Sequence, residues 1–195
     1  ITQGLKNNIY IGGETDYGNK IPRVQRWMHN DDVPFSELWK QQFSRWQPQK
    51  YIPPIKELQD NLIEMYHTRY LFPEFVTIPE INSALVNKYR SGNDSISFHR
   101  DNLPEFGENP TIMVASFGET RTIQFRRVKY NLDNPKSMKL DKDKQDQNFN
   151  IELEEGSLLI MGGATQKYYS HGIDKHLTNN ERYSITFREH HSGFR

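Results

Sequence analysis

The chain has 195 residues, in which 25 Lys+Arg balance 25 Asp+Glu, and it contains no cysteine. The net charge of zero excludes a global field that attracts polyanions, so any contact with nucleic acid must come from a local patch. The absence of cysteine excludes disulfides and thiolate metal sites. No apolar run approaches the ~20 residues of a membrane-spanning helix, so we expect no membrane association. The length predicts one domain with a real core.

The first part of the chain predicts irregular structure followed by helices. Residues 1–34 are rich in Gly, Asn and Asp and predict strand fragments and loops around Asn8–Ile11 and Pro22–Trp27. The chain begins Ile-Thr-Gln, with neither Met nor a basic segment before an apolar one, so we expect a trimmed chain and not a signal peptide. Apolar residues at helical spacing then predict one helix over Phe35–Trp46 and another over Pro54–Tyr70.

Beyond Asn82 the pattern changes to an alternation of apolar and polar residues, which is typical of β-strands. Short strands at this spacing, with turn residues between them, predict an all-β sandwich or barrel. Residues 130–148 are rich in Lys, Asp and Asn and predict a long solvated hairpin loop. The predicted strands are Ser83–Arg90, Asp94–Asp101, Thr111–Phe117, Arg121–Val128, Phe149–Leu153, Ser157–Met161, Tyr168–Ile173 and Arg182–Arg188.

The tripeptide His99-Arg100-Asp101 is the candidate metal motif. Alternate residues of a strand point to one face, so His99 and Asp101 can present an imidazole and a carboxylate side by side, opposite Ile96 and Phe98. A second imidazole, for which His171 is the candidate, completes a 2-His-1-carboxylate set that binds iron(II) and leaves positions open for substrates such as O2.

The motif alone is weak, because about 0.4 His-x-Asp matches are expected by chance from the composition. A second match, His29-Asn30-Asp31, lies in a polar stretch that predicts a turn. The other histidines lack a comparable context, and we expect them to be solvated; they are His67, His176, His190 and His191.

The last predicted strand divides cleanly into two faces. Tyr183, Ile185 and Phe187 lie on one face, and the other face carries Arg182, Ser184, Thr186 and Arg188. Arginines in an apolar core require anions, and the guanidinium fork suits carboxylates. The face therefore predicts a small dicarboxylate with one end on a metal and the other on an arginine. The alternative is a solvent-facing side that makes ordinary surface ion pairs.

Seven short motifs follow one another over some 165 residues. They are Pro22-Arg23-Val24-Gln25; Asn87-Lys88-Tyr89-Arg90 with Gly92 and Asp94; His99-Arg100-Asp101; Ala115-Ser116-Phe117-Gly118-Glu119-Thr120-Arg121; Gly156-Ser157-Leu158-Leu159-Ile160-Met161; Gly163-Ala164-Thr165-Gln166 with His171; and Arg182-x-Ser184-x-Thr186-Phe187-Arg188. In this order they resemble the AlkB-type branch of the iron(II)/2-oxoglutarate dioxygenases, from about Ile21 to Phe187.

The resemblance implies a mostly β (α+β) protein, in which a double-stranded β-helix, or jelly-roll, carries N-terminal helices packed on one sheet. It divides the chain into an N-terminal extension and nucleotide-recognition lid over residues 1–50 and a jelly-roll core over residues 51–195. It also implies Fe(II), 2-oxoglutarate and O2 as cofactor and co-substrates. The implied iron ligands are His99, Asp101 and His171, and the residues implied to hold 2-oxoglutarate are Asn87, Tyr89, Arg182, Ser184 and Arg188.

The resemblance further implies alkylated DNA or RNA as the partner, with the target base flipped out of its stack. In relatives an aromatic ring of the lid sandwiches the base against the first iron-binding histidine. Trp27 and Phe35 are the candidates here, and the alternative for each is core packing. Arg23 and Gln25 are placed near the substrate. Phosphate contacts are expected from a patch of Arg121, Arg126, Arg127 and Lys129, with Arg23 and Arg26 on the lid side; the alternative is a mixed-charge sheet edge.

Two positions depart from the family pattern. Repair-active relatives carry an acidic residue directly after the iron-binding aspartate, whereas Asn102 and Leu103 follow here and the nearest acid is Glu105. Because that acid helps to read the amino edge of the base, Asn102 leaves the identity of the substrate open. Ser184 stands where many relatives have Asn, and a hydroxyl can still donate to a carboxylate.

Three functions follow from this pattern. The first is an oxidative nucleic-acid dealkylase, the second a hydroxylase of the same fold that acts on a protein side chain or a small molecule, and the third a non-catalytic nucleic-acid-binding jelly-roll. An intact metal set together with both arginines favours an enzyme over the third. We expect a monomer inside the cell, in cytoplasm or nucleus.

Overall fold

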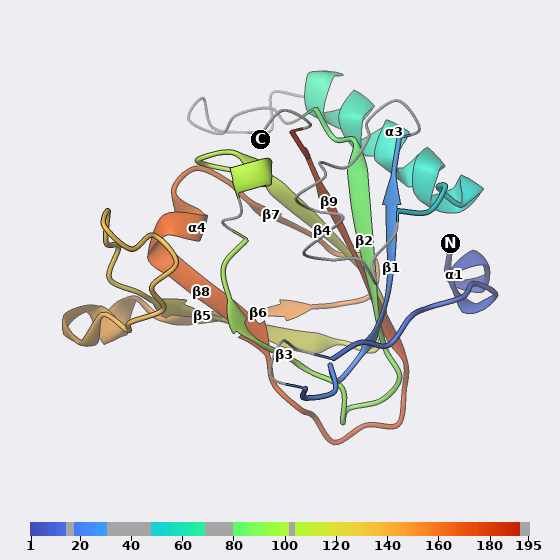
Figure 1. The fold of residues 1–195 in the computed structure, drawn as a ribbon. Helices are drawn as coiled ribbons and strands as arrows, with labels where there is room; N and C mark the ends of the chain where they lie inside the picture. The colour runs from blue at the N-terminus through green and yellow to red at the C-terminus, as the bar shows by residue number, and fades with distance from the viewer. Residues whose placement is uncertain (15–17, 31–47, 69–79, 102–103, 192–195) are drawn as a thin grey trace.

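Two antiparallel sheets face one another in the computed structural model, which describes residues 1–14, 18–30, 48–68, 80–101 and 104–191 (Figure 1). The larger sheet has the strand order β1-β2-β9-β4-β7, and the smaller has the order β3-β8-β5-β6. The strands are β1 (Val24–His29), β2 (Ser83–Tyr89), β3 (Ile96–His99), β4 (Ile112–Gly118), β5 (Arg121–Arg127), β6 (Phe149–Leu153), β7 (Leu158–Met161), β8 (Tyr169–Ile173) and β9 (Arg182–Arg188).

The chain from β2 to β9 winds between the two sheets and changes sheet at every connection except the one from β5 to β6. This winding is a double-stranded β-helix, which confirms the predicted jelly-roll. The helical elements are short apart from α3; they are α1 (Thr2–Lys6), α3 (Pro53–Thr68), α4 (Thr165–Tyr168) and the 3-10 turns η1 (Pro104–Phe106) and η2 (Lys142–Gln147).

The larger sheet is buried on both faces, because α3 and α1 cover its outer side and the smaller sheet covers its inner side (Figure 1). On the outer side, Ile55 of α3 and Leu5 of α1 pack in one cluster with Ile185 and Phe187 of β9. Between the sheets, a second cluster contains Tyr89 and residues from both sheets. Every residue of β9 is consequently buried. The alternative of a solvent-facing strand is therefore wrong.

The eight strands beyond residue 82 lie where the alternation predicts them, and two of them, β6 and β9, have the predicted bounds. Strand β3 is shorter than predicted, and its pairing with β8 shifts register between Ile96 and His99. Ile96 accordingly packs against the cluster between the sheets, while the guanidinium of Arg126 lies 3.7 Å from the ring centroid of Phe98. The prediction that Ile96 and Phe98 share a face was wrong.

The N-terminal part differs more from the predictions. Helix α1 forms at Thr2–Lys6, where strand fragments and loops were expected, because Leu5 gains burial in the outer cluster. Around Asn8–Ile11 the structure has one isolated bridge, from Ile11 to Gln25. Strand β1 pairs with β2 along its whole length, so residues assigned to a lid contribute a strand to the larger sheet. The division at residue 50 stays a prediction.

The predicted helix over Phe35–Trp46 lies outside the described residues, and the predicted helix over Pro54–Tyr70 is confirmed as α3. The segment between β5 and β6 joins two paired strands and contains the exposed turn η2, as a solvated hairpin loop should. Among the described residues, no helix combines the length and apolar character needed to cross a bilayer.

Candidate metal centre and anion pocket

Three side chains from distant parts of the sequence meet between the two sheets. His99, Asp101 and His171 each offer one ligand atom, and these atoms lie within 4.8 Å of one another. Nε2 of His99 is 3.9 Å from Oδ1 of Asp101, and Nε2 of His171 is 3.6 Å from Oδ2. Two imidazoles and one carboxylate at this spacing form a set that suits iron(II).

Strand pairing brings the two histidines together. His99 ends β3 and lies opposite His171 of β8, and their ring centroids are 4.4 Å apart. Glycine at position 172 allows this close approach, because a Cβ there would lie 3.0 Å from the carbonyl oxygen of Ile96 and 3.1 Å from the amide nitrogen of Phe98. The register of two strands, more than the tripeptide alone, therefore creates the pair.

Asp101 lies beyond the end of β3, and a side chain from α4 holds its backbone. The amide N–H of Asp101 donates to Oε1 of the buried Gln166 at 2.8 Å. Gln166 belongs to one of the sequence motifs, but no role was assigned to it from sequence. It is a positioning residue for the carboxylate, and metal-ligand geometry depends on such partners.

The charges around Asp101 favour its ionised form. Burial raises the pKa of this carboxyl, but Arg188, with Nη2 3.5 Å from Oδ1, and the neighbouring histidines outweigh burial and hold the pKa well below its usual range. Loss of water and the nearby His171 lower the pKa of His99 to about 4. Nδ1 of His99 donates a hydrogen bond to the Ser97 carbonyl at 2.9 Å. The lone pair of the neutral imidazole therefore lies on Nε2, where it can bind a metal.

Aromatic rings enclose the Arg188 guanidinium. Its Cζ lies 4.6 Å from the ring centroid of Phe106 and 5.6 Å from that of Trp27. Trp27 is only 4% exposed and belongs to β1. The structure therefore favours the alternative of core packing for Trp27 and places it beside Arg188; its stacking on a flipped base stays a prediction.

Arg182 places a separate buried cation at the other end of β9. Its side chain is 0% exposed, and Nη2 donates to Oγ of Ser116 at 3.0 Å. Its Nε and Nη1 are buried without a hydrogen-bond partner among the described residues. Burial lowers the pKa of Arg182, and no carboxylate within the described part of the chain pairs with it. A buried guanidinium with unused N–H groups fits an anionic ligand.

The neighbouring strands add polar groups to the same inner face. Tyr89 lies opposite Arg182 in the register, and its ring centroid is 5.1 Å from the guanidinium. Asn87 lies opposite Ser184. The amide oxygen of Asn87 accepts hydrogen bonds from Nε of Arg23 at 2.9 Å and Nε2 of Gln25 at 2.8 Å. Because both hydrogen bonds go to the amide oxygen, the NH2 group of Asn87 can donate to a ligand.

These contacts change the roles expected for the lid residues. Gln25 is buried and fixes the Asn87 amide, and Arg23 is part-buried and also donates to the Ser95 carbonyl at 3.2 Å. Both residues therefore hold the Asn87 amide, from β1 and from the segment before it. Their predicted contact with a nucleic-acid substrate stays a prediction.

One residue of the predicted basic surface patch, Arg121, is buried. Arg121 is only 3% exposed, lies 5.6 Å from the Tyr89 ring centroid and donates to the backbone carbonyls of Asp94 and Asp174. The prediction of an exposed Arg121 was wrong, because Arg121 alternates with the buried residues Ile123 and Phe125 and shares their face. Arg126 remains part-exposed over Phe98.

Two predicted substrate residues, Phe35 and Asn102, lie outside the described residues. Among the histidines expected to be solvated, His176 is exposed, whereas His190 is buried, and its ring centroid lies 6.0 Å from that of Phe106. The prediction for His190 was wrong because the chain after β9 remains bonded to Asn82, which accepts a hydrogen bond from the His190 amide at 2.8 Å.

The comparisons with known proteins agree with this geometry. The family model described as the 2OG-Fe(II) oxygenase superfamily matches residues 10–188. The chain belongs to this superfamily. Membership confirms the predicted cofactor class of Fe(II), 2-oxoglutarate and O2. The unpartnered atoms of Arg182 and the donor set around Asp101 fit these groups.

Individual members of the superfamily are similar over most of the chain. Alpha-ketoglutarate-dependent dioxygenase alkB homolog 3 of Homo sapiens is 30% identical over 178 residues, which cover 91% of this chain and 54% of that protein. DNA oxidative demethylase ALKBH2 of Arabidopsis thaliana is 26% identical over 159 residues, covering 75% and 48%. The chain thus spans about half the length of these curated relatives, and the resemblance to AlkB-type members is confirmed.

A solved structure supports the fold. The structure of OsALKBH1 matches with a TM-score of 0.59 at 16% identity and covers 96% of this chain and 90% of that chain. The two proteins therefore share the jelly-roll fold.

Because His190 is buried, we expect the free energy of unfolding to depend on pH. Burial, together with Arg188, His191 and His29, lowers the pKa of His190 from its ordinary value of 6.5 to about 4. The unfolded chain therefore takes up the proton first, and the free energy of unfolding of the metal-free protein should fall as the pH drops from 6.5 to 4. We expect His190→Gln to remove on the order of 1–3 kcal/mol of this loss in urea titrations.

His176→Gln is the matched control, because His176 is exposed, and we expect its pH profile to follow that of the unmodified protein. If the free energy of unfolding of His190→Gln depends on pH between 6.5 and 4 in the same way as that of the unmodified protein, His190 is not the source of the loss of stability.

Proposed function

We propose that the chain is an Fe(II)/2-oxoglutarate-dependent dioxygenase that oxidatively removes alkyl groups, such as methyl, from nucleobases of DNA or RNA. One observation carries the proposal: a 2-His-1-carboxylate set and a buried guanidinium with unused donors share the inside of one jelly-roll. A protein that only bound nucleic acid would have no need for both.

The proposed iron ligands are Nε2 of His99, Nε2 of His171 and the carboxylate of Asp101. Three features prepare them. Their geometry is set by strand pairing, the low pKa of His99 keeps its imidazole neutral at pH 7, and the carboxylate is ionised. Metal ligands must be deprotonated in this way. With 2-oxoglutarate and O2, the bound iron supplies the oxidising power that hydroxylates a C–H bond.

The co-substrate 2-oxoglutarate is a dicarboxylate, and β9 offers two arginines for it. We assign its distal carboxylate to Nε and Nη1 of Arg182, beside Tyr89, and its other end to the neighbourhood of Arg188. Asn87 and Ser184, which lie opposite each other in the register, complete the polar wall. The guanidinium fork makes paired hydrogen bonds that a carboxylate can accept.

One O2 and one 2-oxoglutarate give succinate and CO2, and one oxygen atom enters the methyl C–H bond of the base. The resulting N-hydroxymethyl group breaks its C–N bond, releases formaldehyde and returns the proton to the ring nitrogen. The names of the similar human and Arabidopsis proteins, a dioxygenase and a DNA oxidative demethylase, support a nucleobase as substrate. Such a substrate places the enzyme inside the cell.

Arg182→Met tests the co-substrate assignment. Methionine has an apolar side chain that fills similar space, so the variant removes the charge and its donors. We expect the Kd for 2-oxoglutarate to rise on the order of 100-fold, because a buried charged contact is lost. Fe(II) binding alone should persist. Arg126→Met, on the outer face over Phe98, is the matched control and should bind 2-oxoglutarate normally; equal affinities for both variants would refute the role of Arg182.

Succinate release tests the function itself. Purified enzyme with Fe(II), 2-oxoglutarate and O2 is given methylated single-stranded DNA or RNA, the same oligonucleotides without methyl groups, or nucleic-acid-free hydroxylase substrates. We expect succinate and formaldehyde in equal amounts only with the methylated oligonucleotides. Stimulation only by the nucleic-acid-free substrates would favour a hydroxylase of the same fold and overturn the dealkylase proposal.

A further inference from the structure

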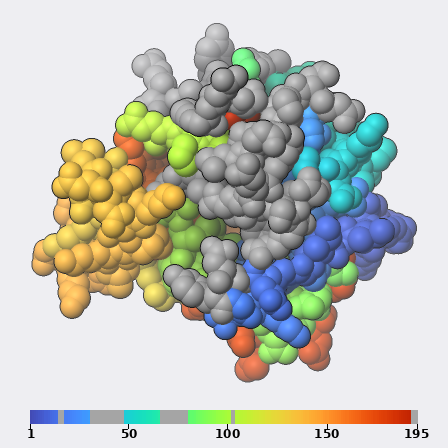
Figure 2. Space-filling model, viewed as in Figure 1, coloured from blue at the N-terminus to red at the C-terminus, as the bar shows by residue number. Residues whose placement is uncertain are grey.

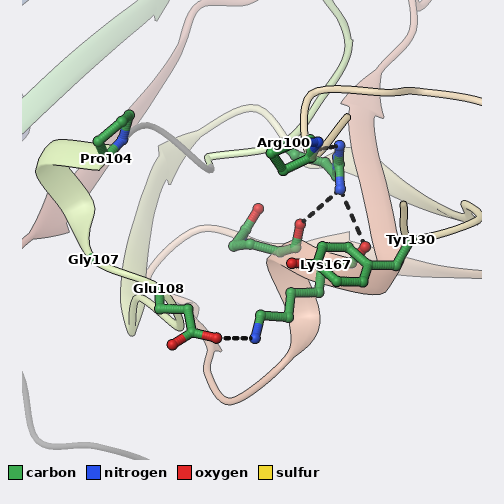
Figure 3. Close-up of a pocket in the computed structure, with 8 residues that line it drawn as sticks. Arg100, Pro104, Gly107, Glu108, Tyr130 and Lys167 are labelled. Carbon is green, nitrogen blue, oxygen red and sulfur yellow. Dashed lines mark hydrogen bonds and ion pairs between the residues drawn. The ribbon is translucent and has the colours of Figure 1, made fainter. Parts of the chain in front are cut away.

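A pocket of about 300 Å³ is lined by Arg100, the residue between two of the proposed iron ligands in the sequence (Figure 3). Its walls come from residues 104–108, from residues 130–135 of the loop between β5 and β6, and from residues 166–167 of α4. Arg100, which lines it, stands between His99 and Asp101 in the sequence, and Gln166 holds the Asp101 amide. Two residues of the lining are thus directly connected to Asp101, Arg100 through the chain and Gln166 through a hydrogen bond.

Arg100 fixes the walls and leaves a donor unused. The side chain is 8% exposed; Nη1 donates to the Lys167 carbonyl at 3.2 Å, and Nη2 donates to the Ser137 carbonyl at 2.8 Å and to the Pro135 carbonyl. Its Nε is buried with no hydrogen-bond partner within the described part of the chain. Arg100 therefore adds to the pocket wall a positive charge that no carboxylate of the described residues pairs with.

Lys167 adds a second cation at the rim. Its Nζ is 2.6 Å from Oε1 of Glu108 (Figure 3). The two partners differ in exposure, since the lysine side chain is 21% exposed and the glutamate 80%. An exposed ion pair contributes little to stability, so a phosphate can replace the solvated Glu108 carboxylate while the ammonium stays in place.

Aromatic rings alternate with the cations from this rim outward. Lys167 Nζ lies 5.7 Å from the ring centroid of Tyr130, which is 5.9 Å from that of Tyr168. The Arg127 guanidinium lies 4.4 Å from the Tyr168 ring and 5.2 Å from the Tyr169 ring. Figure 2 shows the β5–β6 loop (gold) beside the η1 segment (yellow-green) on one face of the molecule.

We propose that this pocket, with the row of rings and cations that begins at Tyr130, binds the nucleotide next to the target base in a single-stranded substrate. Phosphate would replace Glu108 on Lys167, and the base or sugar would pack on Tyr130. Single-strand binding proteins combine the same two elements, cations for the backbone and rings for the bases. The inference rests on the proposed function, since it places the neighbour of the base undergoing reaction.

The test measures binding of a fluorescent, unmethylated single-stranded oligonucleotide by anisotropy, so that it does not depend on turnover. We expect Lys167→Ala and Tyr130→Ala each to raise its Kd roughly five- to tenfold. We also expect Lys167→Ala to lower the slope of log Kd against log salt by about one. Glu108→Gln should lower the Kd, because it frees the ammonium.

Lys56→Ala is the matched control. It removes a lysine from another exposed ion pair, the one with Asp60 on α3 on the outer side of the larger sheet, and it should leave the Kd unchanged. Thermal unfolding confirms that each variant is folded. The opposite signs expected for Lys167→Ala and Glu108→Gln distinguish a binding role from a structural one, which would affect both partners alike.

The two proposals fail separately. If methylated oligonucleotides are demethylated but Lys167→Ala and Tyr130→Ala bind like the unmodified protein, or if Lys167→Ala and Glu108→Gln shift the Kd in the same direction, the pocket proposal is overturned and the dealkylase proposal stands. If binding depends on Lys167 and Tyr130 but no methylated oligonucleotide releases succinate, the pocket proposal stands and the dealkylase proposal fails. Absence of any oligonucleotide binding by the unmodified protein overturns the pocket proposal.

Discussion

The carboxylate of Asp101 is the point at which the parts of the candidate site depend on one another. It lies within 4 Å of both histidine rings and of the Arg188 guanidinium, and its backbone is tied to Gln166 on a separate element. A buried carboxylate is costly unless positive groups surround it. Arg188 supplies positive charge here, and a divalent ion bound by the carboxylate and the imidazoles would add to it.

The jelly-roll makes this concentration of polar groups possible. Because helix α3 covers the outer side of the larger sheet, the apolar residues of β9 can face α3 while its arginines and hydroxyls face inward. The interior is then apolar between the larger sheet and α3 and contains polar groups between the two sheets. Arg182 is fully buried with unused donors, so the protein maintains a cationic interior that an anionic co-substrate is suited to complete.

Much of this arrangement follows from local sequence, and the remainder depends on partners. Alternation placed the strands and divided β9 correctly, because a strand with two buried faces still keeps period 2. The bulge in β3 could not be predicted, since it depends on the close approach that Gly172 of β8 permits. Gln25 and Trp27 were assigned to a lid, because local sequence does not reveal that their strand pairs with β2, which is a long-range contact. Arg121 was missed, although it shares the buried alternation of Ile123 and Phe125.

The most direct test is an anaerobic titration with Fe(II) and 2-oxoglutarate, followed by visible absorption. We expect a weak charge-transfer band for the unmodified protein and for His176→Ala, which alters an exposed histidine, and no band for His99→Ala. Equal spectra for His99→Ala and the unmodified protein would show that the proposed ligands do not hold the iron, and would contradict the account.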